Sequence, residues 1–205
     1  MPFQPAYSLD AINAKGVGVR IAFERTGDRY SHTLYCIHKN QIDAILTSVD
    51  DADYRGWPRS IPVQEVRPTR PAGEIALVLM GAAASGHWSV TVRTVGPDAN
   101  PYLEFDVAVR LARLPAHLGM CYELLGNAVW IDDHSGLTSA RLEPHSIVMS
   151  PPPRADNSSS NQVEQLKTLA DPANPRHRLF VPTAKLAEHY PATYRWQHCI
   201  GSAFA

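Results

Sequence analysis

The sequence has few cysteines, no long apolar segment and no dense run of charge of either sign. Its three cysteines, Cys36, Cys121 and Cys199, are widely spaced and form no CxxC pair, which argues against a disulfide framework and favours small buried apolar side chains. No segment approaches the roughly 18 consecutive apolar residues of a membrane helix, and the N-terminal sequence lacks the basic and apolar regions of a signal peptide. These absences predict a soluble cytoplasmic protein that does not contact a membrane.

The charge balance excludes a further class of partner. The 19 lysines and arginines are scattered among 20 acidic residues, and the net charge is −1. A chain without a basic patch has no strong field to attract nucleic acid, so we expect no nucleic-acid partner. Its 205 residues, 44% of them apolar, are enough to bury a core without disulfides or a metal ion.

Motifs for catalysis and cofactor binding are also missing. There is no GxSxG, GxGxxG or GxxxxGK[ST], and the nine histidines form no HxH or HExxH spacing. Ser85-Gly86-His87 places a serine near a histidine, but catalytic triads are assembled in space rather than by adjacency. Asp132-Asp133-His134 groups three possible metal ligands in one turn, where such clusters are usually solvated. The sequence therefore predicts no cofactor and no metal site, and leaves enzyme activity uncertain.

Two segments alternate almost perfectly between apolar and polar residues. In His87–Val95, Trp88, Val90 and Val92 fall on one face, and in Leu103–Leu111 every second residue from Leu103 is apolar. A period of two predicts strands with one buried face. The turn formers at 96–101 join the two strands into a hairpin.

Shorter segments of similar character surround this hairpin. Val17–Glu24 and Tyr30–His38 predict a second hairpin, and Glu74–Met80 is apolar enough for a strand buried on both faces. Residues 1–16 are expected to be an irregular lead-in. Further short strands are expected at 63–66, 146–149, 120–125 and 128–131, the last two joined by a Gly-Asn turn, and at 42–49, which fits one helical turn equally well. About nine strand candidates with short connections predict a mainly β fold, an antiparallel β-sandwich or open barrel.

The composition changes after residue 150. Three prolines and a serine-rich stretch make 150–161 a linker that cannot bury enough apolar surface to fold by itself. Two short helices are predicted beyond it, at Gln162–Leu169 and Thr183–His189, each preceded by a capping residue. The expected organisation is a β domain at 1–150 and a proline-rich tail at 151–205 that packs on it.

The polar face of the 87–111 hairpin holds the first candidate site. With Val95 opposite Tyr102, Arg93 lies opposite Glu104 and His87 opposite Arg110. A slip of two residues keeps the faces and pairs Arg93 with an aspartate, Asp106, instead. One interpretation is a solvated set of cross-strand ion pairs, worth about 0.2–1 kcal/mol each. The other is a polar site in which Arg93 and Arg110 hold a carboxylate or phosphate.

Trp57 is the second candidate. It lies in a loop at 50–71 that is rich in proline and aspartate. Together with its neighbours Tyr54 and Pro58 it would make a stacking platform for a sugar or peptide. Alternatively, its large ring covers one end of the core.

Three segments resemble recurring signatures of an uncharacterised bacterial protein family. They are Trp57–Glu65 (a Trp-Pro-x-Ser-x-Pro-x-Gln pattern), His87–Val90 (His-Trp-Ser) and Phe105–Arg110 (Phe-Asp-Val-Ala-x-Arg). The resemblance covers about residues 17–125 and implies no activity, since no function is established for that family. The chain departs from the pattern at Asp50-Asp51, where an acidic residue followed by glycine is expected.

Two hypotheses about function follow. The first is a non-catalytic module that binds a protein partner or a small polar ligand, using Trp57, Arg93 and Glu104. The second is a small-molecule hydrolase or isomerase whose catalytic residues are His32, His87, Asp106 and Arg110 on one sheet face. A homo-oligomer is compatible with either, and the identity of the ligand stays open.

Overall fold

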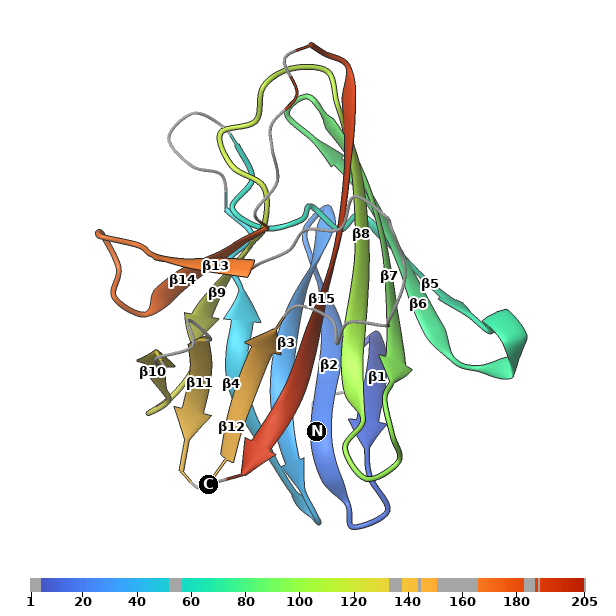
Figure 1. Cartoon of the computed structure of the whole chain (residues 1–205), viewed down its shortest axis with the longest axis vertical. Coiled ribbons are helices and arrows are strands. Elements are labelled where there is room, and N and C mark those ends of the chain that lie inside the picture. Colours follow the sequence, from blue (N-terminus) through green and yellow to red (C-terminus); the bar gives the residue numbers. More distant parts are fainter. Residues whose placement is uncertain are drawn as a thin grey trace.

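The computed structural model describes residues 5–51, 57–132, 138–143, 145–150, 166–182, 187 and 189–204. They form two antiparallel β-sheets, so the expected mainly β fold is confirmed (Figure 1). The seven-stranded sheet contains, in spatial order, β1 (Tyr7–Ile12), β2 (Val17–Thr26), β3 (Arg29–His38), β4 (Gln41–Ser48), β9 (Met120–Leu124), β14 (His177–Pro182) and β13 (Leu166–Ala170). The eight-stranded sheet contains β10 (Val129–Asp132), β11 (Thr138–Leu142), β12 (His145–Ser150), β15 (Ala192–Phe204), β8 (Tyr102–Leu111), β7 (Gly86–Val95), β6 (Ala76–Ala83) and β5 (Glu65–Thr69).

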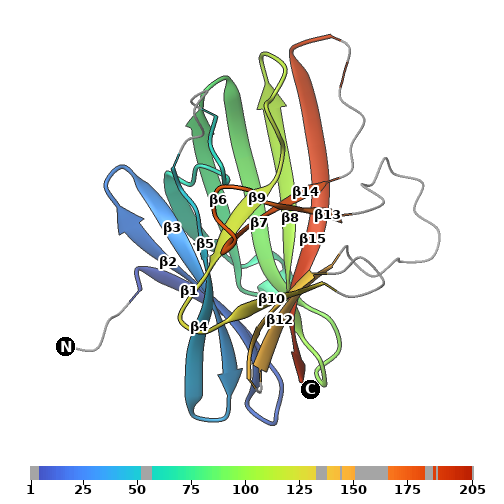
Figure 2. The same cartoon turned by 90° about the vertical axis from the view of Figure 1, so that its left-hand side faces the viewer.

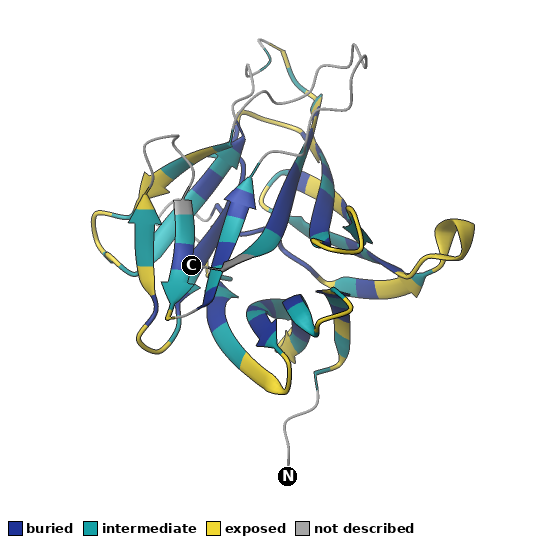
Figure 3. Cartoon of the chain, turned by 60° about the horizontal axis from the view of Figure 1, so that its bottom comes forward, coloured by how far each residue is buried: buried dark blue, intermediate teal, exposed yellow. Residues whose placement is uncertain are grey.

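The two sheets share one apolar core. Figure 2 shows the blue strands of the first sheet on one side and β7, β8 and β15 of the second on the other. Alternate residues of β2 and β8, among them Ile21, Phe23, Phe105 and Val107, are at most 1% exposed and belong to the same cluster. The buried residues gather along the facing strands, while the end of the β5–β6 hairpin projects outward and is exposed (Figure 3). Burial of one face is the physical cause of the period of two in the sequence.

Both predicted hairpins are confirmed. In β7 and β8, Arg93 lies opposite Glu104 and His87 opposite Arg110, which is the first of the two predicted registers. In β2 and β3 the strands turn at Gly27, whose φ of 65° is a conformation that glycine adopts without strain. The strand at 42–49 is β4, so the helical alternative for it is wrong.

The prediction of two C-terminal helices is wrong for the residues that the structure describes. Leu166–Leu169 lies in β13, which pairs with β14, and the described residues contain no α-helix. The residues of the second predicted helix lie outside the described ones except Ala187 and His189, which are not helical. The chain instead ends in the 13-residue strand β15, which pairs with β8 on one side and β12 on the other (Figure 1). Its inward face carries the polar His198 beside Trp196, which hides the alternation in the sequence.

Other differences concern the smaller strands. Residues 7–12 of the expected lead-in form β1, which pairs along its whole length with β2. The Gly-Asn turn at 126–127 does not make a hairpin, because β9 and β10 belong to different sheets. Glycine at 126 has a φ of 54° and turns the chain from one sheet to the other. The edge strand expected at 63–66 is displaced to β5.

The segment 57–64 joins the two sheets. Val63 accepts a hydrogen bond from the Tyr30 amide in the first sheet, while the Gln64 amide donates to Met80 in the second. The approach to β6 is so close that a Cβ on Gly81 would lie 1.5 Å from the Pro62 carbonyl oxygen. Only glycine fits at that position without a backbone shift. Over the described residues, no helix has the length and apolar character needed to span a membrane.

Candidate functional site

The polar face of β7 and β8 carries two ion pairs. The guanidinium of Arg93 donates to Glu104, with Nε 2.8 Å from Oε1. Arg195, which β15 brings alongside, donates from Nε to Asp106 at 2.9 Å. Each acid on this face is therefore matched by an arginine, as the solvated-pair interpretation predicts.

Two basic side chains at the end of the same face have no such match. His87 and Arg110 lie opposite each other and are both exposed. Within the described part of the chain, neither takes part in an ion pair or a side-chain hydrogen bond. The charged face thus ends in an uncompensated arginine beside an imidazole.

A cleft of about 540 Å³ opens at this end of the sheet, at the β6–β7 turn and the end of β8, which lie near the top of Figure 1. Its walls carry His87 and Arg110 and are otherwise made of small residues, namely Ala82, Ala83, Ala84, Ser85, Gly86, Ala112 and Pro191. The turn is tight because Ala84 adopts a φ of 52°. Short side chains on three neighbouring strands leave space above the sheet that longer ones would fill.

Ser85 adds a further polar group to this cleft. Its hydroxyl is buried and has no hydrogen-bond partner among the described residues. Its carbonyl, in contrast, accepts a hydrogen bond of 2.9 Å from the amide of Ala112. A buried hydroxyl without a partner costs about 1–3 kcal/mol, a cost that a ligand oxygen would remove.

The arrangement suits an anion. Arg110 presents the planar fork that binds a carboxylate through two parallel hydrogen bonds, while His87 and Ser85 offer further donors. The alanines supply an apolar wall for a short aliphatic group. The volume lies within the range of roughly 300–1,000 Å³ typical of small-molecule sites.

The residues expected to act together in catalysis lie apart. His32 is buried between the sheets, where its Nε2 lies 3.0 Å from the hydroxyl of Tyr122. Burial lowers the pKa of His32 to about 3, so the ring is neutral at physiological pH. Asp106 is paired with Arg195, and the cross-strand neighbour of His87 is Arg110 rather than a carboxylate. The structure thus brings together only His87 and Arg110 of the four.

Trp57 is buried, at 5% exposure, and packs edge-on against His117 with ring centroids 6.4 Å apart. This placement fits the alternative in which the ring covers the core, and it leaves no open aromatic face for stacking. Tyr54 lies outside the described residues, as do Asp133 and His134 of the possible metal turn.

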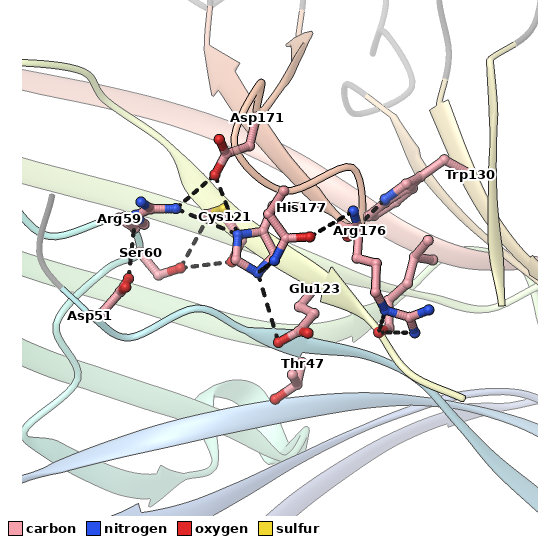
Figure 4. Close-up of polar contacts among 12 residues, drawn as sticks. Thr47, Asp51, Arg59, Ser60, Cys121, Glu123, Trp130, Asp171, Arg176 and His177 are labelled. Atoms are coloured by element: carbon pink, nitrogen blue, oxygen red, sulfur yellow. Dashed lines mark hydrogen bonds and ion pairs between the residues drawn. The ribbon is translucent and has the colours of Figure 1, made fainter. Parts of the chain in front are cut away.

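Next to Trp57, Arg59 is the centre of a polar cluster that the sequence patterns did not single out (Figure 4). Its Nη1 lies 2.8 Å from Asp171 and 3.4 Å from Nδ1 of His177, and its Nε lies 3.4 Å from Asp51. The backbone N–H of Ala173 lowers the pKa of the Asp171 carboxyl, and Arg59 and His177 lower it further. The cluster fastens the turn before β14 to the Trp57 loop.

This Arg59 cluster lacks a nucleophile. Ser60 is held by Cys121, donating to its carbonyl at 2.8 Å and accepting from its amide at 3.1 Å. Burial raises the pKa of the Cys121 thiol to about 12, so it is not a thiolate at neutral pH. Over the described residues, no group of three or more His, Cys, Asp or Glu side chains is placed to hold a metal ion.

Comparisons with protein-family models, with curated proteins and with solved structures find no match for this chain. The resemblance to an uncharacterised bacterial family therefore stays a prediction. The residues that the sequence patterns missed are Ser85 as a cleft residue, and Arg59, Asp171 and His177 as a cluster. A signal existed only for the turn after Asp171, where two prolines and an asparagine follow within four residues.

Proposed function

We propose that this protein is a non-catalytic β-sandwich module that binds a small aliphatic carboxylate in the cleft between His87 and Arg110. One observation carries the proposal. Arg110 is uncompensated beside a cleft, while Arg93 and Arg195 on the same face are each paired with an acid. Arg93 and Glu104 then keep the sheet face neutral and leave Arg110 as the charge that selects the ligand.

The lining sets the class of ligand. The alanine side chains offer contact to a short aliphatic tail, and Arg110 and His87 line the same cleft, so an anionic head with a short tail suits both. A sugar phosphate would need more polar walls. Butyrate is therefore the probe of choice, and butanol of the same length is the neutral comparison.

The test is a titration of the full chain with butyrate, followed by the amide chemical shifts of β7 and β8. We expect Arg110→Gln to weaken binding at least tenfold, because a hydrogen bond to a charged group contributes about 1.5–3 kcal/mol. Arg70→Gln, at an exposed arginine near the far end of the sheet, is the matched control and should bind as the parent does. Equal binding of butanol and butyrate, or an Arg110→Gln variant that binds normally, would show the proposal to be wrong.

A further inference from the structure

A second cavity lies between the sheets and differs from the cleft in every respect. It is a narrow gap between side chains, with no position that accommodates a water molecule. It is lined by the thioether residues Met120 and Met149, the imidazole of His198 and the indole of Trp196. Tyr122, Phe180 and Leu166 complete the wall. Two thioethers and an imidazole therefore line one gap that water does not fill.

His198 supplies a donor atom that the fold leaves unused. Its Nδ1 is buried and has no hydrogen-bond partner among the described residues, although the residue is only 3% exposed. Its ring stacks on Phe105, with centroids 4.7 Å apart and planes inclined by 16°, which fixes the ring orientation. A buried imidazole nitrogen without a partner costs stability unless something binds it.

The two methionines reach the gap from different sheets. Met120 comes from β9 of the seven-stranded sheet, and Met149 from β12, which lies beside β15 and His198 in the other sheet. Both are 3% exposed. Trp196, two residues before His198 on the same inward face, presents an aromatic ring to the same space.

This set of donors discriminates among metal ions. Thioether sulfur and imidazole nitrogen are soft or borderline ligands that select Cu(I). Calcium and magnesium require oxygen ligands, and magnesium keeps several waters, for which the cavity has no room. Structural zinc sites use thiolate, imidazole or carboxylate ligands. A monovalent ion also loses less hydration free energy than a divalent one on entering an apolar interior, and an indole ring attracts a cation.

We propose that Met120, Met149 and His198 bind one Cu(I) ion between the sheets, with the ring of Trp196 against it. The β13–β14 hairpin is the route of entry. Leu166 and Phe180 of that hairpin close the cavity, and β13 is an edge strand paired with β14 alone. Opening of the hairpin exposes the donors without disturbing the facing sheets. The site is independent of the Arg110 cleft.

The experiment is a competition for Cu(I) between the full chain and a chromophoric bicinchoninate chelator, under anaerobic conditions with ascorbate. We expect one equivalent to bind and to quench tryptophan fluorescence. Met149→Leu, which conserves volume, should weaken binding at least tenfold, and Met120→Leu with Met149→Leu should abolish it. Met80→Leu, on the β6 strand outside the cavity, is the matched control and should bind as the parent does.

Two outcomes would overturn the proposal. One is absence of binding at one equivalent by the parent chain. The other is full binding by the double leucine variant with a native circular dichroism spectrum, which would assign the copper to the free thiols Cys36, Cys121 and Cys199. Since a fall in affinity also follows from misfolding, His198→Gln is measured in parallel by Ag(I) titration, with the urea midpoint of each variant recorded. Loss of Ag(I) binding at an unchanged midpoint supports the assignment, and unchanged Ag(I) binding contradicts it.

Discussion

The imidazole Nε2 of His32 and the hydroxyl of Tyr122 lie 3.0 Å apart in the space between the two sheets, where both side chains are almost fully buried. Each is a polar partner of the other in a mainly apolar layer. The backbone amide of His32 in turn donates to Ser48, whose hydroxyl donates to Asp50. A short polar chain thus leads from the protein surface to the middle of the core.

Acid should destabilise the fold through its buried histidines. Burial lowers the pKa of His32 and of His198 from 6.5 to about 3. Below pH 6.5 these two histidines therefore bind protons in the unfolded chain but not in the folded chain. Each histidine then removes about 1.4 kcal/mol of unfolding free energy per pH unit until the pH nears 3, and its full contribution is present above pH 6.5. Urea unfolding between pH 7.5 and 5 measures this slope. His32→Gln keeps a hydrogen-bond partner for Tyr122. It should reduce the pH dependence of the unfolding free energy by the amount that one proton contributes, and an unchanged pH dependence would contradict a role for His32.

Asp50 should have the opposite effect on the unfolding free energy as the pH falls. Burial raises the pKa of its carboxyl to about 6, so its charged form costs stability above pH 6 and the cost disappears toward pH 4. Asp50→Asn keeps an acceptor for Ser48 and removes the charge. We expect the variant to gain up to about 2 kcal/mol at pH 7.5 and almost nothing at pH 4. Asp28→Asn, at an exposed carboxyl, is the control and should show no gain at either pH.

Gly81→Ala tests the contact that joins the loop to β6. A Cβ there would meet the Pro62 carbonyl oxygen at 1.5 Å, so the two backbones must separate. We expect a loss of about 3 kcal/mol or more in the urea-derived unfolding free energy. Gly27→Ala is the comparison, because a Cβ there meets nothing within 4 Å and only the φ of 65° is strained. A loss there of about 1 kcal/mol is expected, and equal losses at both sites would argue against a steric cause.

Removing Arg59 should loosen the β13–β14 hairpin more than the whole fold. Arg59→Gln takes the cation from Asp171, which is 17% exposed and keeps its negative charge. We expect faster amide exchange in β14, corresponding to about 1–2 kcal/mol of local opening, with little change at β7 and β8. Arg67→Gln removes an exposed pair with Glu65 and should leave β14 unchanged. Uniform acceleration across both sheets in Arg59→Gln would contradict a local role.

The parts of the fold that the sequence predicts are those where local pattern and burial agree. The alternation in β7 and β8 predicts their buried faces and leaves two registers, of which the structure shows the one that pairs Arg93 with Glu104. The cleft was not predictable, because it depends on small residues of three strands meeting at one end of a sheet. The cavity was not predictable either, since it joins Met120 to Met149 and His198, which come 29 and 78 positions later in the chain.

Residues 151–205 show where the local sequence pattern fails to predict the structure. The linker predicted at 150–161 lies, apart from Ser150, outside the described residues, and its composition says nothing about the strands beyond it. The alternation of Tyr194, Trp196, His198 and Ile200 was present in the sequence, yet a histidine on the inward face reads as polar. Only the partner strands β8 and β12 show that this histidine belongs to a buried face.

The position of β15 governs the order in which the molecule can be completed. It is the last strand in the sequence and lies in the interior of its sheet, between β8 and β12. During synthesis both neighbours leave the ribosome with an unpaired edge facing the gap, and such edges are templates for pairing with other chains. A chain that stops before residue 192 would therefore leave β8 and β12 each with an open edge. Production of the intact protein depends on protecting that gap until the final strand arrives.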